Sequence, residues 1–163
     1  MTNEEFDIYI KSILNMDDFR GIDASLNGIQ VSADIGSVSK IAFSVDACME
    51  SFRRAKEAGA DLLFVHHGLF WGKEISITGM HFKRIQFLIK NNLSLYAAHL
   101  PLDAHPEYGN NAGIVSLLGL ENIEPFGSFG GIKIGYKGSF SEPKLLFDVA
   151  DMLDARTPGN GTL

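Results

Sequence analysis

The sequence predicts an α/β fold with a mainly parallel sheet, helices on both faces and an additional antiparallel strand. Short apolar segments with β-branched residues alternate with segments of helical periodicity. The apolar segments are nearly continuous, as in strands buried on both faces, and their alternation with helices implies right-handed crossovers between parallel strands. A later segment alternates apolar and polar residues, which indicates a half-exposed antiparallel strand.

The chain is expected to begin with a helix over about residues 3–14. Thr2 and Glu5 have the spacing of a capping box, and apolar residues then recur at helical intervals. Polar, turn-like residues follow at 15–21. The next motif, Leu26-Asn27-Gly28-Ile29-Gln30-Val31, combines an Asn-Gly turn signal with a short strand.

Three similar units come next, each led by a strand. The predicted strands cover residues 41–45, 62–65 and 94–98. The first is followed by a helix that ends near Gly59, the second by a loop and a helix over residues 79–90, and the third by a short helix over residues 112–118. In such sheets ligands bind beyond the carboxyl ends of the strands.

Acids and histidines follow all three strands at that edge. Asp46 follows the first strand, His66 and His67 the second, and the third is followed by His99, Asp103 and His105. Imidazole and carboxylate ligands together suit zinc, iron, manganese, nickel or cobalt. The sequence therefore predicts a metal site at this edge.

The adjacency of two histidines adds a geometric expectation. Successive strand side chains point to opposite sides, so His66 and His67 are expected to diverge and to serve one ion each of a pair about 3.5–4 Å apart. Asp103 would be a bridging or terminal carboxylate, and Gly68 would allow a sharp turn beneath the site. The plainer alternative is that loop histidines are surface groups and that Asp46 only caps the next helix.

The remaining sequence predicts one domain over residues 1–153 and a polar tail over residues 154–163. Residues 132–136 alternate in the manner of an antiparallel strand. Ser141 is expected to cap a final helix with Pro143 in its first turn and Leu145 on its buried face. The tail carries Pro and Gly and shows no periodicity.

Composition limits the function classes. The 163 residues are 45% hydrophobic and 21% charged, with net charge −6 and no dense basic run, so a nucleic-acid partner is not expected. No apolar run reaches the length of a membrane span and the N-terminus lacks a signal peptide, which predicts a cytoplasmic location. The single cysteine, Cys48, excludes an intrachain disulfide and a cysteine-rich zinc site, and is expected to be a small buried side chain.

The sequence resembles the GTP cyclohydrolase I type 2 homologues, also called Nif-three-like proteins, over about residues 3–153. The resemblance rests on the ordered set of motifs rather than on one of them. These motifs are residues 26–31, 43–47, 61–71, 124–127 and 131–135, and above all 96–111, with Ala98-His99-Leu100-Pro101-Leu102-Asp103-Ala104-His105-Pro106 at their centre.

The resemblance implies an α/β fold, a site for two divalent metal ions and assembly into a ring-shaped homohexamer. It implies that His66, His67 and Asp103 are metal ligands. It assigns Asp46, His99 and His105 to positions around the metal or the substrate.

The activity implied by the family is that of a metal-dependent hydrolase, of cyclohydrolase or phosphoesterase type, acting on a small nucleotide-like substrate. In the family a second half contributes a His and a Glu to the metal site, and here neither residue occurs after Glu142. Three ligands could hold one ion with open positions, or a pair with water filling in, or another subunit could complete the site. The alternatives are a fragment of a longer protein or a non-catalytic regulatory module that keeps the fold with an incomplete metal site.

Overall fold

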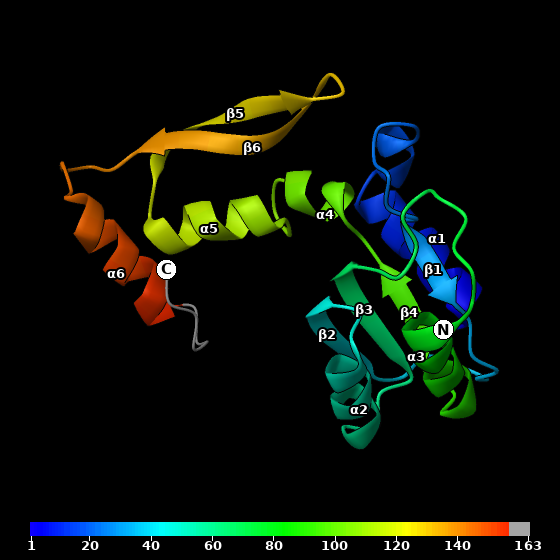
Figure 1. Ribbon diagram of the computed structural model, residues 1–163. Coiled ribbons are helices and arrows are strands. Elements are labelled where there is room, and N and C mark those ends of the chain that lie inside the picture. Colours follow the sequence, from blue (N-terminus) through cyan, green and yellow to red (C-terminus); the bar gives the residue numbers. More distant parts are fainter. Residues whose placement is uncertain (157–163) are drawn as a thin grey trace. The chain divides into compact units, whose positions relative to one another are not determined.

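A four-stranded sheet organises the first part of the chain (Figure 1). Its strands lie in the order β1-β4-β3-β2, where β2, β3 and β4 run parallel and β1 is antiparallel to β4. The bounds are β1 (Gly28–Val31), β2 (Ile41–Asp46), β3 (Leu62–His67) and β4 (Ser94–Ala97). The predicted α/β fold with a mainly parallel sheet is confirmed.

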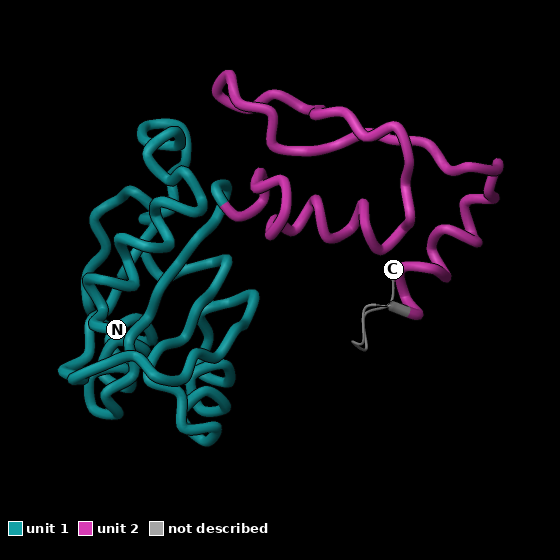
Figure 2. Tube along the Cα trace, turned by 180° about the vertical axis from the view of Figure 1, so that it is seen from behind, with its two compact units in different colours: residues 1–101 teal, residues 102–163 magenta. Residues whose placement is uncertain are grey.

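The protein, here a computed structural model, is described over residues 1–156. Its residues group into two compact units, 1–101 and 102–163 (Figure 2). The sheet belongs to the first unit. The single domain over residues 1–153 stays a prediction, and residues 157–163 of the predicted tail lie outside the described residues.

Helices cover both faces of this sheet, as predicted. Helices α2 (Met49–Glu57) and α3 (Gly79–Lys90) pack over one apolar face, where Leu63, Val65 and Leu95 are almost fully buried. Helix α1 (Asn3–Ile13), which has the predicted capping box, lies on the other face, followed by the short 3-10 helix η1 (Met16–Phe19). Burial on both sides explains why β3 and β4 have continuous apolar sequences.

A row of aromatic rings crosses the face that α1 covers. Phe43, Phe64 and Tyr96 occupy paired positions on β2, β3 and β4, and Phe6 of α1 meets Tyr96 edge to face at 5.3 Å. Tyr96 is fully buried, whereas Phe43 on the edge strand is 74% exposed. Coverage of both faces therefore holds for the central strands, and not for β2, where Val45 is also exposed.

The second unit is built from a hairpin and helices. Its elements are α5 (Asn110–Leu118), β5 (Glu121–Phe129), β6 (Ile132–Ser139) and α6 (Leu146–Arg156), and α4 (Leu100–Ala104) lies at the division. Strand β6 is antiparallel, as predicted, but its partner β5 was not predicted. The sequence did not predict β5 because it contains Pro125 and two charged residues. Proline is tolerated at the edges of sheets, and both strands of a two-stranded sheet are edges.

The last helix differs from the prediction at both ends. Helix α6 begins after Pro143, leaves Leu145 71% exposed and continues to Arg156, three residues into the predicted tail. No described helix has both the length and the apolar character that crossing a bilayer requires.

Candidate metal centre

The carboxyl end of β3 carries the two adjacent histidines. Leu62–Val65 is buried, and His66 and His67 complete the strand with partly exposed side chains. Their ring centroids lie 4.6 Å apart, so the rings do not diverge as strand alternation predicted. The pairing of β3 with β4 ends at Val65, one residue before the first histidine. Beyond that point β3 pairs only with β2. Strand pairing on one side constrains the direction of the side chains less than pairing on both sides.

A third histidine joins this pair from the neighbouring strand end. His99 follows β4, and its ring centroid lies 4.8 Å from that of His66 and 5.8 Å from that of His67. One ring nitrogen of each of the three lies within 4.8 Å of the others. Nitrogens bound to one zinc ion at about 2.0–2.1 Å lie roughly 3.3 Å apart in a tetrahedral site. The three imidazoles could hold a divalent metal ion, and we call them the His cluster.

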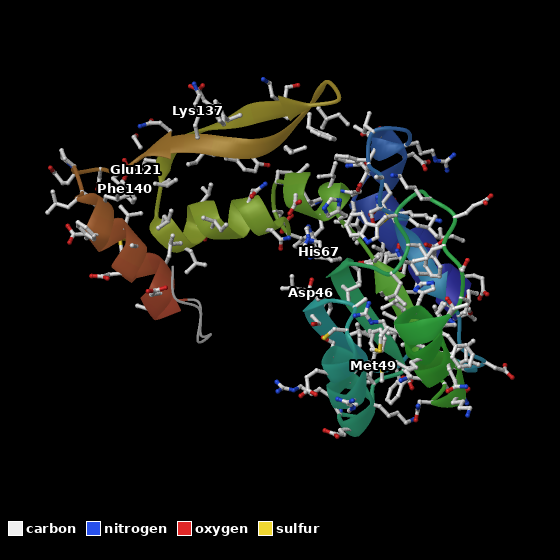
Figure 3. All side chains as sticks on the ribbon, viewed as in Figure 1. Asp46, Met49, His67, Glu121, Lys137 and Phe140 are labelled. Atoms are coloured by element: carbon white, nitrogen blue, oxygen red, sulfur yellow. The ribbon has the colours of Figure 1, made fainter. Side chains whose placement is uncertain are left out.

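Asp46 orients one member of the His cluster. From the end of β2 its Oδ1 lies 2.8 Å from Nδ1 of His67, and both residues are labelled in Figure 3. This contact leaves Nε2 as the nitrogen of His67 that can bind a metal. The alternative that Asp46 caps α2 is wrong, because the N-cap is Cys48, whose sulfur accepts a hydrogen bond from the N–H of Ser51. Cys48 is partly exposed rather than buried.

Asp23 orients another member, and sequence reasoning missed it. Oδ1 accepts hydrogen bonds from the N–H of Ser25 and Nδ1 of His99, both at 2.9 Å. Oδ2 accepts from Nδ2 of Asn27 at 2.8 Å and the N–H of Leu100 at 3.0 Å. Burial raises the pKa of Asp23, but these hydrogen bonds outweigh it and the pKa lies below its usual value. Locally, the sequence indicates only that Asp23 and Ser25 have the spacing of an Asx turn, which does not predict the contact with His99.

The motif over residues 26–31 forms hydrogen bonds with the segments that follow the histidine-bearing strands. Oδ1 of Asn27 accepts a hydrogen bond from the N–H of His99 at 2.8 Å. Gln30 accepts one from the N–H of Leu69 at 2.6 Å and donates one to the carbonyl of Leu26 at 2.8 Å. Two side-chain amides thus tie β1 and the loop before it to the segments that follow β3 and β4.

Gly68 lies where the packing leaves no room for a side-chain carbon. A Cβ there would lie 2.3–2.5 Å from the side-chain amide of Gln30, closer than non-bonded atoms approach. The φ angle of Gly68 is not in the left-handed region, whereas that of Gly72 is, at 65°. Left-handed backbone in this loop therefore occurs at Gly72 and not at Gly68.

Asp103 and His105 belong to the second unit. Asp103 lies in α4 and accepts a hydrogen bond from Nδ2 of Asn110 at 3.0 Å. Nδ1 of His105 accepts the N–H of Glu107 and of Tyr108, and its ring stacks on Tyr108. The ligand role of Asp103 and the supporting role of His105 stay predictions.

Comparison with known proteins gives consistent matches along the chain. A family model described as Duf34/NIF3 (NGG1p interacting factor 3) matches residues 1–162. A protein of Treponema pallidum named GTP cyclohydrolase 1 type 2 homolog is 49% identical over 142 residues, 87% of this chain and 50% of the relative. A protein of the same name from Pyrococcus abyssi is 43% identical over 158 residues, 97% of this chain and 62% of the relative.

The fold also matches a solved structure. A crystal structure of a Thermus thermophilus protein has a TM-score of 0.82 and 44% identity, and the match covers 94% of this chain and 60% of the other. This chain therefore spans between half and about three fifths of the length of these relatives.

Proposed function

This chain belongs to the Duf34/NIF3 family, and on that premise we propose that it binds divalent transition-metal ions through His66 and His67, with Asp103 as the carboxylate ligand. The observation that carries the proposal is the convergence of three imidazoles from two strand ends. That convergence makes His99 a candidate ligand rather than only a neighbour of the metal. Two ions per site, drawn from zinc, iron, manganese, nickel or cobalt, form the finer part of the proposal.

The chemistry we propose is metal-dependent hydrolysis of a small nucleotide-like substrate by an assembly of identical chains, hexameric as the family resemblance implies. A bound divalent ion would lower the pKa of water toward neutrality. The chain's own part is to hold the imidazoles in place. Asp46 holds the ring of His67, so that its Nε2 atom is left for coordination.

Metal content tests the binding step. Protein purified without chelator is measured by mass spectrometry for transition metals, together with His66→Ala/His67→Ala and the control His81→Ala. His81 lies on α3, where its ring meets Phe70 edge to face, and it is not part of the His cluster. We expect the wild type and the control to bind metal and the double variant to lose it. Less than about 0.1 ion per wild-type chain, with no change in the double variant, would refute metal binding.

Turnover tests the catalytic step. A panel of nucleotides and phosphoesters is incubated with metal-loaded and chelator-treated protein, and products are separated by chromatography. Metal-dependent product formation supports a hydrolase. Metal binding without turnover of any compound favours the alternative, a non-catalytic binding or regulatory module.

A further inference from the structure

The carboxylate of Asp23 is saturated by donors from two segments of the chain. Its side chain is 2% exposed, and each oxygen accepts two hydrogen bonds. Ser25 and Asn27 come from its own loop, and His99 and Leu100 from the segment after β4. An ionised carboxylate only accepts hydrogen bonds, so every one of these four groups must present a hydrogen to it.

This requirement decides the tautomer of His99. With Nδ1 bonded to Oδ1 of Asp23 at 2.9 Å, Nδ1 must carry the hydrogen of the neutral ring. The lone pair of the imidazole is then on Nε2. Because the backbone N–H of His99 is also held, by Oδ1 of Asn27, the whole residue is fixed at both its backbone and its ring.

We propose that Asp23 is a positioning residue that keeps His99 in its Nδ1–H tautomer and so leaves the Nε2 lone pair available to a metal ion in the His cluster. This inference rests on the proposed metal binding. It concerns a residue that the sequence did not single out, 76 positions away from its partner along the chain.

Replacement by asparagine gives a directional expectation. An amide has one accepting oxygen, so its NH2 group must face one of the two pairs of donors. Facing Asn27 and Leu100, it would meet two fixed donors, because the Asn27 amide is already oriented by its bond to the N–H of His99. Facing Ser25 and His99, the NH2 group meets only one fixed donor, the N–H of Ser25. The imidazole of His99 can change tautomer and accept a hydrogen bond at Nδ1. Asp23→Asn should therefore convert His99 to the Nε2–H tautomer, which blocks the ligand atom.

The first test is nitrogen-15 NMR of labelled histidines in the metal-free chain at about pH 8, above the reference pKa of the free histidine side chain. Long-range proton–nitrogen spectra distinguish the two tautomers. We expect Nδ1–H for His99 in the wild type and Nε2–H in Asp23→Asn, with His81 unchanged. An Nε2–H tautomer in the wild type would overturn the proposal without any variant, and an unchanged His99 tautomer in a folded Asp23→Asn would overturn it as well.

The second test is metal affinity, measured by competition with a chromophoric chelator for zinc. Asp23→Asn should weaken binding by about 10–100-fold. The matched control is Asp61→Asn, since Asp61 also accepts two backbone N–H groups, from Ser39 and Lys40, but at the opposite end of β3. Asp61→Asn should keep wild-type affinity. Equal affinities of the wild type and Asp23→Asn would refute the role of Asp23, whereas a wild type that binds no zinc would refute the proposed function itself.

Discussion

Replacing Gly68 by alanine should destabilise the protein through one neighbouring side chain. The three atoms nearest to the added Cβ all belong to the amide of Gln30, at 2.3–2.5 Å. A flexible side chain can move aside, but Gln30 is held by hydrogen bonds to Leu69 and Leu26. The cost of Gly68→Ala is therefore the loss of those hydrogen bonds.

The magnitude follows from these two contacts. Each hydrogen bond contributes about 1 kcal/mol net, and about 1–3 kcal/mol when its buried partner is left without a replacement. Leu69 is 7% exposed, so water reaches its N–H poorly. We expect Gly68→Ala and Gln30→Ala each to lower the free energy of unfolding by about 2–4 kcal/mol.

The double variant separates this explanation from backbone strain. In the Gln30→Ala background the clash is gone, and Gly68→Ala should be neutral or stabilising by about 0.4–1 kcal/mol, because alanine restricts the unfolded chain. Urea unfolding is followed by the fluorescence of Trp71, the only tryptophan, whose indole N–H donates to the Gly68 carbonyl at 3.0 Å. An equal cost of Gly68→Ala in both backgrounds would refute the reasoning.

Three further substitutions test the fold. Phe52→Ala, at a fully buried core position, should cost about 3–5 kcal/mol in urea unfolding, and a cost below about 1 kcal/mol would contradict its burial. Hydrogen bonds from the N–H groups of Ser39 and Lys40 lower the pKa of Asp61, so its contribution to stability is complete above the unfolded pKa and is lost as pH falls through the lower folded pKa. Asp61→Asn should therefore unfold at less urea than the wild type at pH 7, with the difference shrinking below about pH 4, and a constant difference would refute this. Thr2→Ala removes half of a capping box and should lower the free energy of unfolding by about 1 kcal/mol. The loss would be seen as lower helicity and a lower midpoint of urea unfolding, and an unchanged midpoint would contradict it.

The sequence predicted those elements whose cause is local. The helix over residues 79–90 has the bounds of α3, and the strand over residues 62–65 lies within β3. A period of 3.6 residues or a continuous apolar run depends only on which face of a segment is buried. The strand-end positions of Asp46 and His99 follow in the same way, because the parallel order of strands was already implied by their alternation with helices.

Other features depend on the strand or surface against which a segment packs. Strand β5 carries Pro125 and exposed charges, and only its pairing with β6 makes it a strand. The buried face of α3 is narrow, since Leu88 is fully buried while the apolar Phe82 and Ile89 are 44% and 57% exposed. Apolar character can be seen in the sequence, but burial requires a partner surface.

The candidate site also has features that the sequence determines and features that depend on tertiary contacts. The sequence by itself determined that histidines and carboxylates follow the strands at one edge of a parallel sheet, because strand direction and chain order are enough to place them there. Only the tertiary structure decided that His66 and His67 turn toward each other, that His99 joins them, and that the distant Asp23 holds it. Ring orientation and hydrogen-bond partners are set by contacts between residues far apart in the chain. Such contacts produce no periodic pattern in the sequence from which they could be predicted.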